Sequence, residues 1–575
     1  MKYTHHNNEL NRSHLGMSVY LKGWVAKTRN LGGLIFIDLR DKNGITQLVV
    51  LPENSYYETA TRLKSEYVIE AKGKVIERQS KNKNISTGEI EIEVTELIIL
   101  NEAEMTPIGI SHEDNASEEV RLKYRYLDLR RPVMQNYLLK RSQITQAIRE
   151  SLLEQAFNEF ETPILGKSTP EGARDFLVPS RIYPGEFYAL PQSPQIYKQL
   201  YMVAGFERYF QIARCFRDED LRADRQLEFT QIDVEASFLT ETEIQAVIER
   251  TLAHTFKKVL NHEIELPIRK MPYDEAIRSY GSDKPDLRFD LKLQSYNDLL
   301  DPLQIPLFAD KVVRGFVFNE AEKLTRKELD KLTLLVKKNH ADALAFVKLI
   351  NNELSGSIAK FIANKDAFIE QTNLKEGDIL LLVSSSNYEK TSNAAGVLRK
   401  EIGESFGLAN PNQFEFVWIV DWPLFEFDEE NNRFVALHHP FTAPKEHQKH
   451  LMKENPKAVM AQAYDIVLNG YEIGGGSIRI HESAIQQTMF EVLGLEKEVI
   501  EDRFGFLVGA LKYGTPPHGG LALGLDRIVM LMTNTKNIKD VIAFPKTQSA
   551  RDLMMQAPSG VDHKQLDELK IDFKK

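Results

Sequence analysis

The chain has 575 residues, 42% of them hydrophobic and 27% charged, which is enough for several globular domains with buried cores. Its 83 acidic and 73 basic residues give a formal net charge of −10, which argues against a protein that coats DNA but allows a local surface that grips RNA. The single cysteine, Cys215, excludes an internal disulfide and a zinc ribbon and favours a reducing compartment. The N-terminus lacks the apolar core of a signal peptide, and no apolar run approaches the ~20 residues of a membrane helix, so we expect a cytoplasmic protein that enters no membrane.

The first hundred residues combine short apolar strands with turn signals. Alternation such as Glu89 to Val94 has the period of two that is typical of a half-buried strand. Five strands, with a helix over 53–66 between the third and fourth, predict an OB-type barrel that binds single-stranded nucleic acid. The predicted strands are 18–28, 33–41, 44–52, 67–78 and 88–100.

Candidate nucleic-acid contacts lie on the second and third of these strands and before the turn between the first two. Phe36 could stack a base, a contact worth ~1–3 kcal/mol, while Arg29 and Gln47 could read base edges. The alternative is that Phe36 belongs to the barrel core, since Ile35 and Ile37 flank it. Both interpretations stay open at this point.

A polar linker is predicted over 101–120, followed by a segment, RLKYRYLDLRR (121–131), with five basic residues in eleven. Taken alone, such a segment is typical of a solvated helix face; beside a barrel that holds RNA, it becomes a candidate contact to the RNA backbone. A helix is then predicted over 144–157. GKST at 166–169 is not a P-loop, because position 161 is Glu, and the chain contains no GxGxxG, HExxH or GxSxG motif.

The segment 190–206 predicts an amphipathic helix with Ser193 as N-cap and Pro194 in its first position. Gln195 and Lys198 lie opposite the apolar stripe, near a helix N-terminus that favours an anionic group. A solvent-facing helix is the more common interpretation of such a pair taken alone.

A hairpin is predicted over 208–238. Period-two alternation gives one polar face with Cys215, Arg217 and Glu219 on the first strand and a second set on the other. Because an aromatic side chain sits among the charges, a nucleotide-binding floor is a better interpretation than an ion-paired surface, and arginine recognises phosphate with two parallel hydrogen bonds. The set on the second strand is Phe229, Gln231, Asp233 and Glu235.

Three segments near the end of the chain add further candidates. Asp465 and Glu472 offer the oxygen ligands that Mg²⁺ prefers, and the glycines 474–476 allow a ligand to approach the backbone. Residues 524–527 predict a strand-to-helix turn that carries Arg527. His438 and its neighbour His439 have no third His or Cys ligand at a spacing that would make a zinc site.

These segments match known motifs. Phe160-Glu161-Thr162-Pro163 resembles motif 1 of class II aminoacyl-tRNA synthetases, Arg217-Asp218-Glu219 with Phe229 resembles motif 2, and Gly524-Leu525-Asp526-Arg527 resembles motif 3. The stretches TPEGARDFLVPSR, ALPQSPQIYKQL, EFTQIDVE and YEIGGGSIRIH are similar to the aspartyl-tRNA synthetases of the bacterial type. The resemblance covers essentially the whole chain.

The resemblance implies an α+β multidomain protein: an OB-fold barrel that reads the anticodon, a catalytic domain with an antiparallel sheet, and an inserted α+β domain whose role the sequence leaves open. It also implies a homodimer, since motif 1 forms the interface in this family. The expected divisions are 1–104 for the barrel, 105–135 for the hinge, 136–282 and 416–575 for the catalytic domain, and 283–415 for the insert.

The resemblance further implies the roles of individual residues. Arg217 and Arg527 are expected to act on the phosphates of ATP, with adenine stacked between Phe229 and Arg527, and Asp465 and Glu472 are expected to hold Mg²⁺. Aspartate is expected to contact Glu171, Gln195, Lys198, Arg217, Asp233, His438 and Arg479, with Lys198 and Arg479 as the clamp for its side-chain carboxylate and residues 166–173 as a lid. The remaining expected ATP contacts are Asp218, Glu219, Gln226, Glu472, Gly524, Leu525 and Asp526, and the expected tRNA contacts are Arg29, Phe36, Gln47, Glu91, Arg222 and Arg225.

Four functions remain on this scaffold. The first is an ATP-dependent ligase for aspartate and tRNA(Asp), and the second is a relaxed form that also charges tRNA(Asn); Leu31, Lys81 and Lys83 favour the strict form. The third is a non-catalytic RNA-binding protein, which predicts the loss of motif arginines that this chain retains. The fourth is a tRNA-independent amino-acid ligase, which would lack the barrel.

By simple alternation, Glu472 and Arg479 fall on opposite faces of one strand, although the clamp and the metal site require both to face one site. A break in the strand at the glycine run would remove this conflict.

Overall fold

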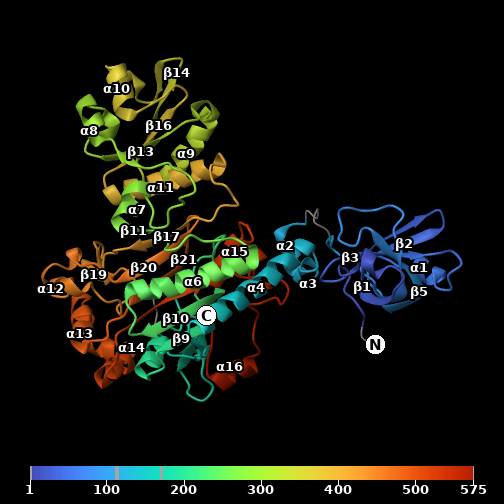
Figure 1. The fold of residues 1–575 in the computed structure, drawn as a ribbon. Helices are drawn as coiled ribbons and strands as arrows, with labels where there is room; N and C mark the ends of the chain where they lie inside the picture. Colours follow the sequence, from blue (N-terminus) through green and yellow to red (C-terminus); the bar gives the residue numbers. More distant parts are fainter. Residues whose placement is uncertain (1–2, 111–115, 169–172, 574–575) are drawn as a thin grey trace. The chain divides into compact units, whose positions relative to one another are not determined.

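The computed structural model describes residues 3–110, 116–168 and 173–573, which form two compact units (Figure 1). The first unit consists of Met1–Arg141 with Lys539–Gly560, and the second of Ser142–Ile538 with Val561–Lys575. Within the described residues, none of the helices combines the length and the apolar character needed to cross a membrane.

The N-terminal part of the first unit is a closed barrel with the strand order β1-β2-β3-β5-β4 (blue in Figure 1). Strands β3 and β5 pair in parallel, and the other neighbours run antiparallel. The five predicted strands are confirmed, whereas the helix between the third and fourth is shorter than predicted. The bounds are β1 Ser18–Leu31, β2 Leu34–Arg40, β3 Ile45–Val50, α1 Tyr57–Thr61, β4 Val68–Glu77 and β5 Ile90–Asn101.

Alternate residues of these strands fill the barrel. Leu21, Ile37, Leu48, Ile69 and Ile92 are fully buried in one core cluster, as period-two patterning requires. The candidate nucleic-acid contacts lie outside this cluster: Arg29 and Phe36 are half-buried, whereas Gln47 and Glu91 are buried.

Three arginines of the basic segment 121–131 bind an acidic residue of the same segment, Asp128. The segment forms α2 (Glu118–Lys123) and α3 (Arg125–Asp128), and α4 (Pro132–Glu154) follows. Three arginines donate to the buried carboxylate of Asp128: Arg121 at 2.9 Å, Arg125 at 2.6 Å and Arg131 at 3.1 Å. At these three positions the expectation of a solvated face or of an RNA contact was wrong, because their guanidinium groups are already bound within the protein.

The second unit is built on an eight-stranded sheet with the order β11-β17-β20-β21-β22-β10-β9-β6. It is antiparallel except for the edge pairs β11–β17 and β6–β9, as expected for the predicted catalytic domain. The bounds are β6 Asn158–Glu159, β9 Arg208–Phe216, β10 Glu228–Ser237, β11 Lys270–Pro272, β17 Phe416–Val420, β20 Ala463–Leu468, β21 Tyr471–Ile478 and β22 His518–Gly524.

Helices and two small sheets complete this domain. The predicted helix over 144–157 is the second half of α4, which ends at Glu154. The hairpin predicted over 208–238 is confirmed as β9 and β10. The other bounds are α5 Gln195–Val203, α6 Glu241–Leu260, α12 Leu451–Glu454, α13 Ser483–Val492, α14 Lys497–Ala510, α15 Leu525–Met532 and α16 His563–Leu569, with the two-stranded sheets β7 Leu177–Pro179 and β8 Phe187–Ala189, and β18 Phe425–Asp428 and β19 Arg433–Ala436.

The inserted segment forms a second sheet, with the order β12-β13-β16-β14-β15, between two cores. Alternation along β16 sends Leu381 and Val383 to one core and Leu380 and Leu382 to the other, so its continuous apolar run is buried on both faces. The bounds are α7 Tyr273–Tyr280, β12 Gln294–Ser295, α8 Asn297–Leu300, β13 Val312–Phe318, α9 Arg326–Lys338, β14 Ala343–Ile350, β15 Glu353–Gly356, α10 Lys365–Thr372, β16 Ile379–Ser385 and α11 Tyr388–Ser405.

Candidate active site

A cavity of about 590 Å³ opens in the second unit, beside the eight-stranded sheet. Its walls come from α5, the β9–β10 hairpin, β20, β21 and the β22–α15 turn, so segments far apart in the chain meet there. The predicted residues that line it are Gln195, Lys198, Arg217, Glu219, Arg225, Gln226, Phe229, Asp233, His438, Asp465, Glu472, Arg479, Gly524, Asp526 and Arg527.

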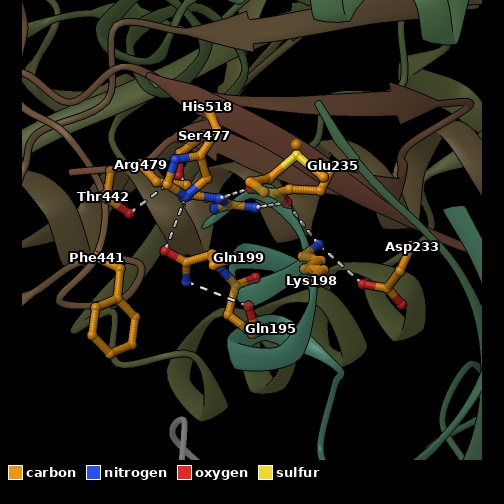
Figure 2. Close-up of polar contacts among 12 residues, drawn as sticks. Gln195, Lys198, Gln199, Asp233, Glu235, Phe441, Thr442, Ser477, Arg479 and His518 are labelled. Carbon is orange, nitrogen blue, oxygen red and sulfur yellow. Dashed lines mark hydrogen bonds and ion pairs between the residues drawn. The ribbon is translucent and has the colours of Figure 1, made fainter. Parts of the chain in front are cut away.

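Helix α5 carries Lys198 into the interior rather than into solvent. Ser193 Oγ accepts a hydrogen bond from the Gln195 N–H at 3.3 Å, and the helix begins at Gln195, one residue later than predicted. The Lys198 side chain is 1% exposed, and its Nζ lies 3.1 Å from Asp233 Oδ1 and 3.5 Å from Glu235 Oε2 (Figure 2). The ammonium of Lys198 is therefore a buried, ion-paired charge at the cavity rather than the solvent-facing charge that is more common for such a helix.

Arg479 lies beside Lys198 because both bind the same carboxylate. Its Nε and one terminal nitrogen donate to the two oxygens of Glu235 at 3.0 and 3.2 Å (Figure 2). The other terminal nitrogen donates to Ser477 Oγ at 2.7 Å and lies 2.8 Å from Nε2 of His439. The predicted pair of cations is therefore brought together, and Glu235 is the group that joins them.

The sequence interpretation assigned no role to Glu235, Ser477 or His439. Glu235 lay on the polar face predicted for the hairpin, so its period-two relation to Asp233 was the signal that could have identified it. No comparable pattern pointed to Ser477 or His439, which reach the site through the pairing of strands distant in the chain.

The two carboxylates beside Lys198, Asp233 and Glu235, differ in the direction of their pKa shifts. Burial raises the pKa of Asp233, and the ammonium of Lys198 offsets this only in part. Burial acts in the same direction on Glu235, but the guanidinium of Arg479 and the ammonium of Lys198 outweigh it and hold the pKa of Glu235 below its usual value. Glu235 is therefore the more acidic of the two carboxylates and the one that both cations share.

The two adjacent histidines are neutral. Burial, with a contribution from Arg479, lowers the pKa of His438 to about 4 and that of His439 well below its usual value. Across the described parts of the chain, no three His, Cys, Asp or Glu side chains converge as ligands for a metal ion.

At the other end of the cavity, Arg217 lies over the ring of Phe229, with its guanidinium carbon 5.1 Å from the ring centroid. Its buried Nε has no hydrogen-bond partner among the described residues, so this donor is free for a ligand. Arg527, which was expected over Phe229, instead donates to the Glu472 carbonyl at 2.8 Å and lies 3.1 Å from Asp224 Oδ2. Gly524 is the N-cap of α15, which confirms the predicted strand-to-helix turn.

A β-bulge brings Glu472 to the cavity. Ile466 of β20 pairs with Gly474 and the next residue, Val467, pairs with Glu472, which leaves Ile473 as the extra residue. The period of two is broken there, so Glu472 and Arg479 both line the cavity, and the conflict expected from simple alternation is removed.

The glycine run serves both the sheet and the cavity. A side chain at Gly476 would overlap the carbonyl of Gly520 on β22, whereas a Cβ at Gly475 would come within 2.5 Å of Asp465 Oδ1. Burial and the neighbouring carboxylates of Glu472 and Asp283 raise the pKa of Asp465 well above its usual range, while Lys284 acts in the opposite direction. Two carboxylates in this setting fit a divalent cation that also binds phosphate oxygens.

Apart from the barrel residues, three predicted site residues within the described part of the chain do not line the cavity. Leu525 is buried in the core, Arg222 is exposed, and Asp218 lies 3.7 Å from Arg174. Glu171 lies outside the described residues, as does part of the expected lid over 166–173.

The barrel gathers its own predicted residues on one face. Arg29 donates to Asp38 at 2.7 Å and to Gln47 at 3.1 Å, and Gln47 donates to Glu91 at 2.5 Å. Phe36 pairs with Arg29 across β1 and β2, is half-buried, and does not belong to the core cluster that contains its neighbours Ile35 and Ile37. The interpretation of Phe36 as a core residue was therefore wrong, and an aromatic beside these polar groups fits a base-stacking surface.

Comparisons with known proteins match the barrel and the catalytic domain to separate family models. Residues 117–548 match the family model described as tRNA synthetases class II (D, K and N), and residues 19–100 match the model described as OB-fold nucleic acid binding domain. The aspartate–tRNA ligase of Lysinibacillus sphaericus is 52% identical over 99% of this chain and 99% of that protein. The aspartate–tRNA(Asp/Asn) ligase of Anoxybacillus flavithermus is 50% identical over 99% of this chain and 98% of that protein.

Among solved structures, the asparaginyl-tRNA synthetase of Pyrococcus horikoshii with asparaginyl-adenylate has a TM-score of 0.59. It covers 94% of this chain and 97% of its own, at 19% identity, and so supports the fold alone.

Proposed function

The chain belongs to the class II tRNA synthetases of the D, K and N group, and we propose that it is the aspartate–tRNA ligase of this group. It activates L-aspartate with ATP to aspartyl-adenylate and transfers the aspartate to the 3′ end of tRNA(Asp). The observation that carries this choice is the buried pair Lys198 and Arg479, which lie close enough to share the carboxylate of Glu235.

This pair selects the amino acid. A bound aspartate side chain supplies the negative charge that the two cations lack, whereas the amide of asparagine leaves buried charge uncompensated, at a cost of several kcal/mol. Lysine would place a third cation in the same pocket. The ammonium group of aspartate is held by Asp233 and Gln195, with Glu171 and His438 nearby.

The first step joins the α-carboxylate of aspartate to the α-phosphorus of ATP. A carboxylate oxygen forms the new bond to phosphorus, the bond to the bridging oxygen breaks, and pyrophosphate leaves with that bond's electron pair. Arg217, whose Nε has no partner among the described residues, donates to the α-phosphate and stabilises the charge that develops there. Phe229 stacks the adenine, Glu219 and Gln226 contact ATP, and Arg527 binds the γ-phosphate after exchanging its contact with Asp224.

Asp465 and Glu472 would hold Mg²⁺, which fits the position of both carboxylates at the cavity and of Asp465 over Gly475. When bound, the ion neutralises charge on the phosphate oxygens. The protein contributes the rigid placement of both carboxylates, since Gly475 lies on β21 and Asp465 on β20 in direct register.

The second step requires tRNA. The terminal ribose hydroxyl attacks the acyl carbon of the adenylate, AMP leaves, and the hydroxyl proton is released. The face of Arg29, Phe36, Gln47 and Glu91 reads the anticodon, and Arg222 and Arg225 of the exposed hairpin loop contact the tRNA. We favour strict charging of tRNA(Asp) because of Leu31, Lys81 and Lys83 at the barrel; Leu31 is 61% exposed at the end of β1.

We further propose a cytoplasmic homodimer. Phe160 of motif 1 packs against Tyr201 and Phe206, and the apolar residues that follow motif 1, Ile164 and Leu165, are exposed. In a homodimer, a second copy of the chain would cover these exposed apolar residues. The single cysteine, Cys215, is buried and cannot form an internal disulfide, which is consistent with a reducing compartment.

The decisive experiment is ATP–pyrophosphate exchange without tRNA across a panel of amino acids. Exchange with aspartate alone supports the function, whereas exchange with another amino acid, or with none, contradicts it. Charging of purified tRNA(Asp) and tRNA(Asn) then separates the strict from the relaxed form.

A further inference from the structure

Asp224, in the loop of the β9–β10 hairpin, reaches the cavity that we assign to ATP. Asp224 and Arg527 both line this cavity, and Asp224 Oδ2 lies 3.1 Å from one terminal nitrogen of Arg527. Neither the motifs nor the expected site residues include Asp224. The guanidinium that we assign to the γ-phosphate is therefore already bound to a carboxylate of the same chain.

The turn that carries Asp224 is fixed by backbone contacts of its neighbours. The Arg225 N–H donates to the carbonyl of Arg222 at 3.1 Å, which closes the turn. The carbonyl of Ala223 accepts a hydrogen bond from the Ile538 N–H at 3.0 Å, and Ile538 also lines the cavity. These contacts do not use the carboxylate of Asp224, so the turn holds this group at the cavity whether or not it is paired.

Arg527 is likewise anchored by a contact that does not involve Asp224. Its other terminal nitrogen donates to the carbonyl of Glu472 on β21 at 2.8 Å. The side chains of Arg527 and Asp224 are 24% and 29% exposed, so water reaches the pair. A partly exposed ion pair contributes little to stability, and it can open while the turn and the anchored guanidinium stay in place.

A carboxylate and a terminal phosphate compete for the same guanidinium nitrogen. Both are anions whose oxygens accept charge-assisted hydrogen bonds from arginine. A carboxylate that stays beside a bound polyphosphate also adds like-charge repulsion. Binding of the γ-phosphate to Arg527 must therefore displace Asp224, and the return of Asp224 offsets the loss of the phosphate contact when pyrophosphate leaves.

We propose that Asp224 is a positioning residue for product release, which competes with phosphate for Arg527. It weakens the binding of the diphosphate end of ATP and speeds the dissociation of pyrophosphate after aspartyl-adenylate has formed. This inference rests on the proposed function and extends it to the step in which the first product leaves.

The first test is calorimetric titration of the full-length protein with magnesium pyrophosphate. Asp224→Asn should bind pyrophosphate about two- to fivefold more tightly than the wild type, the range expected for removal of a partly exposed ion pair. Asp224→Ser, a second neutral variant, should show the same gain, whereas Asp224→Glu retains a carboxylate and should stay near the wild type. The matched control is Asp220→Asn, which removes an exposed acid of the same loop and should change nothing.

The exchange reaction separates this role from a purely structural one. Asp224→Asn should lower the KM for pyrophosphate and for ATP by a similar factor and leave the KM for aspartate unchanged. Pyrophosphate release after a single round of adenylate formation, followed with a coupled pyrophosphatase assay, should be slower in Asp224→Asn, because gains in affinity appear mainly as slower dissociation.

The outcomes distinguish the inference from the proposed function. Tighter pyrophosphate binding by both neutral variants, but not by Asp220→Asn, supports the inference even if no amino acid supports exchange, a result that would defeat only the proposed function. If the wild-type protein exchanges with aspartate but the neutral variants of Asp224 bind pyrophosphate no more tightly than Asp220→Asn does, the inference is overturned and the proposed function stands.

Discussion

Glu235 of β10 and Arg479, which follows β21, are 244 positions apart, yet two hydrogen bonds of 3.0 and 3.2 Å join them in a fully buried site. The same carboxylate lies 3.5 Å from the ammonium of Lys198. Glu235 therefore fixes the spacing of the two cations that we propose recognise the substrate, and the geometry of this pair depends on a residue that is not itself a cation.

Removal of the negative charge of Glu235 should weaken both the binding of aspartate and the stability of the fold. Glu235→Gln leaves two buried cations with too little negative charge, and breaking a buried pair costs about 3–5 kcal/mol. We expect a lower melting temperature and a KM for aspartate raised by at least about tenfold in pyrophosphate exchange. Glu228→Gln, on the same strand but paired with Arg214 at the surface, is the control and should change neither. A Glu235→Gln enzyme with normal aspartate affinity would contradict the clamp.

Arg217→Ala should stop adenylate formation and leave tRNA binding intact. The guanidinium is free to meet the α-phosphate, and removing one such donor typically reduces the rate by about 10²–10³-fold. Pyrophosphate exchange measures the loss of adenylate formation, and a filter-binding titration measures the affinity for tRNA that the variant retains. Arg214→Ala, on β9 just before Arg217 and bound to Glu228, should retain exchange. Near-normal turnover of Arg217→Ala would contradict the proposed role of Arg217 at the α-phosphate.

Phe36→Ala should weaken tRNA charging without slowing pyrophosphate exchange. The ring lies outside the barrel core, and loss of a stacked base costs about 1–3 kcal/mol. The measurement is the KM for tRNA at saturating aspartate and ATP. Ile37→Ala, which empties a core position, is the contrasting variant and should lower the melting temperature. Unchanged tRNA charging by Phe36→Ala would exclude a role in recognition.

Asp128 makes the stability of the first unit depend on pH. Arg121, Arg131 and Arg125 outweigh the effect of burial and hold the pKa of Asp128 below its value in the unfolded chain. A carboxylate of this kind stabilises the fold above its unfolded pKa of ~3.9, and this contribution is lost as the pH falls through the lower, folded-state pKa. Asp128→Asn should therefore lower the melting temperature strongly at pH 7.

The difference between wild type and Asp128→Asn should shrink as the pH falls below the unfolded pKa, because the wild-type carboxylate also becomes protonated. Thermal melts at neutral and acidic pH test this relation. Asp274→Asn, which removes an exposed i,i+4 partner of Arg278, is the control and should show little effect at any pH. A constant difference across the pH range would mean that the arginines do not act through the charge of Asp128.

Several local features could be predicted from the sequence. Alternation located the five barrel strands and the β9–β10 hairpin, and the helical period located α5 and the second half of α4, because these patterns depend on neighbours within one element. The polar face of the hairpin also followed from alternation, and the motifs then identified Lys198, Arg217, Asp233 and Arg527 as members of one site.

Other features required the tertiary structure. The basic segment 121–131 has the composition of an RNA contact, yet its arginines surround Asp128, since composition does not show whether a charge already has a partner. Alternation separates Glu472 from Arg479, and only the bulge at Ile473, created by pairing with β20, reunites them. The partners of Glu235 come from a helix and from a segment far along the chain, a relation that no local period encodes.

By itself, the sequence determined the elements, the family and the cations of the site, because periodicity and motif spacing are local properties of the chain. The tertiary structure alone decided which charges neutralise one another and which carboxylate joins the two cations. The physical reason is that pairing and burial arise between segments hundreds of residues apart, and these contacts determine the electrostatics of a site.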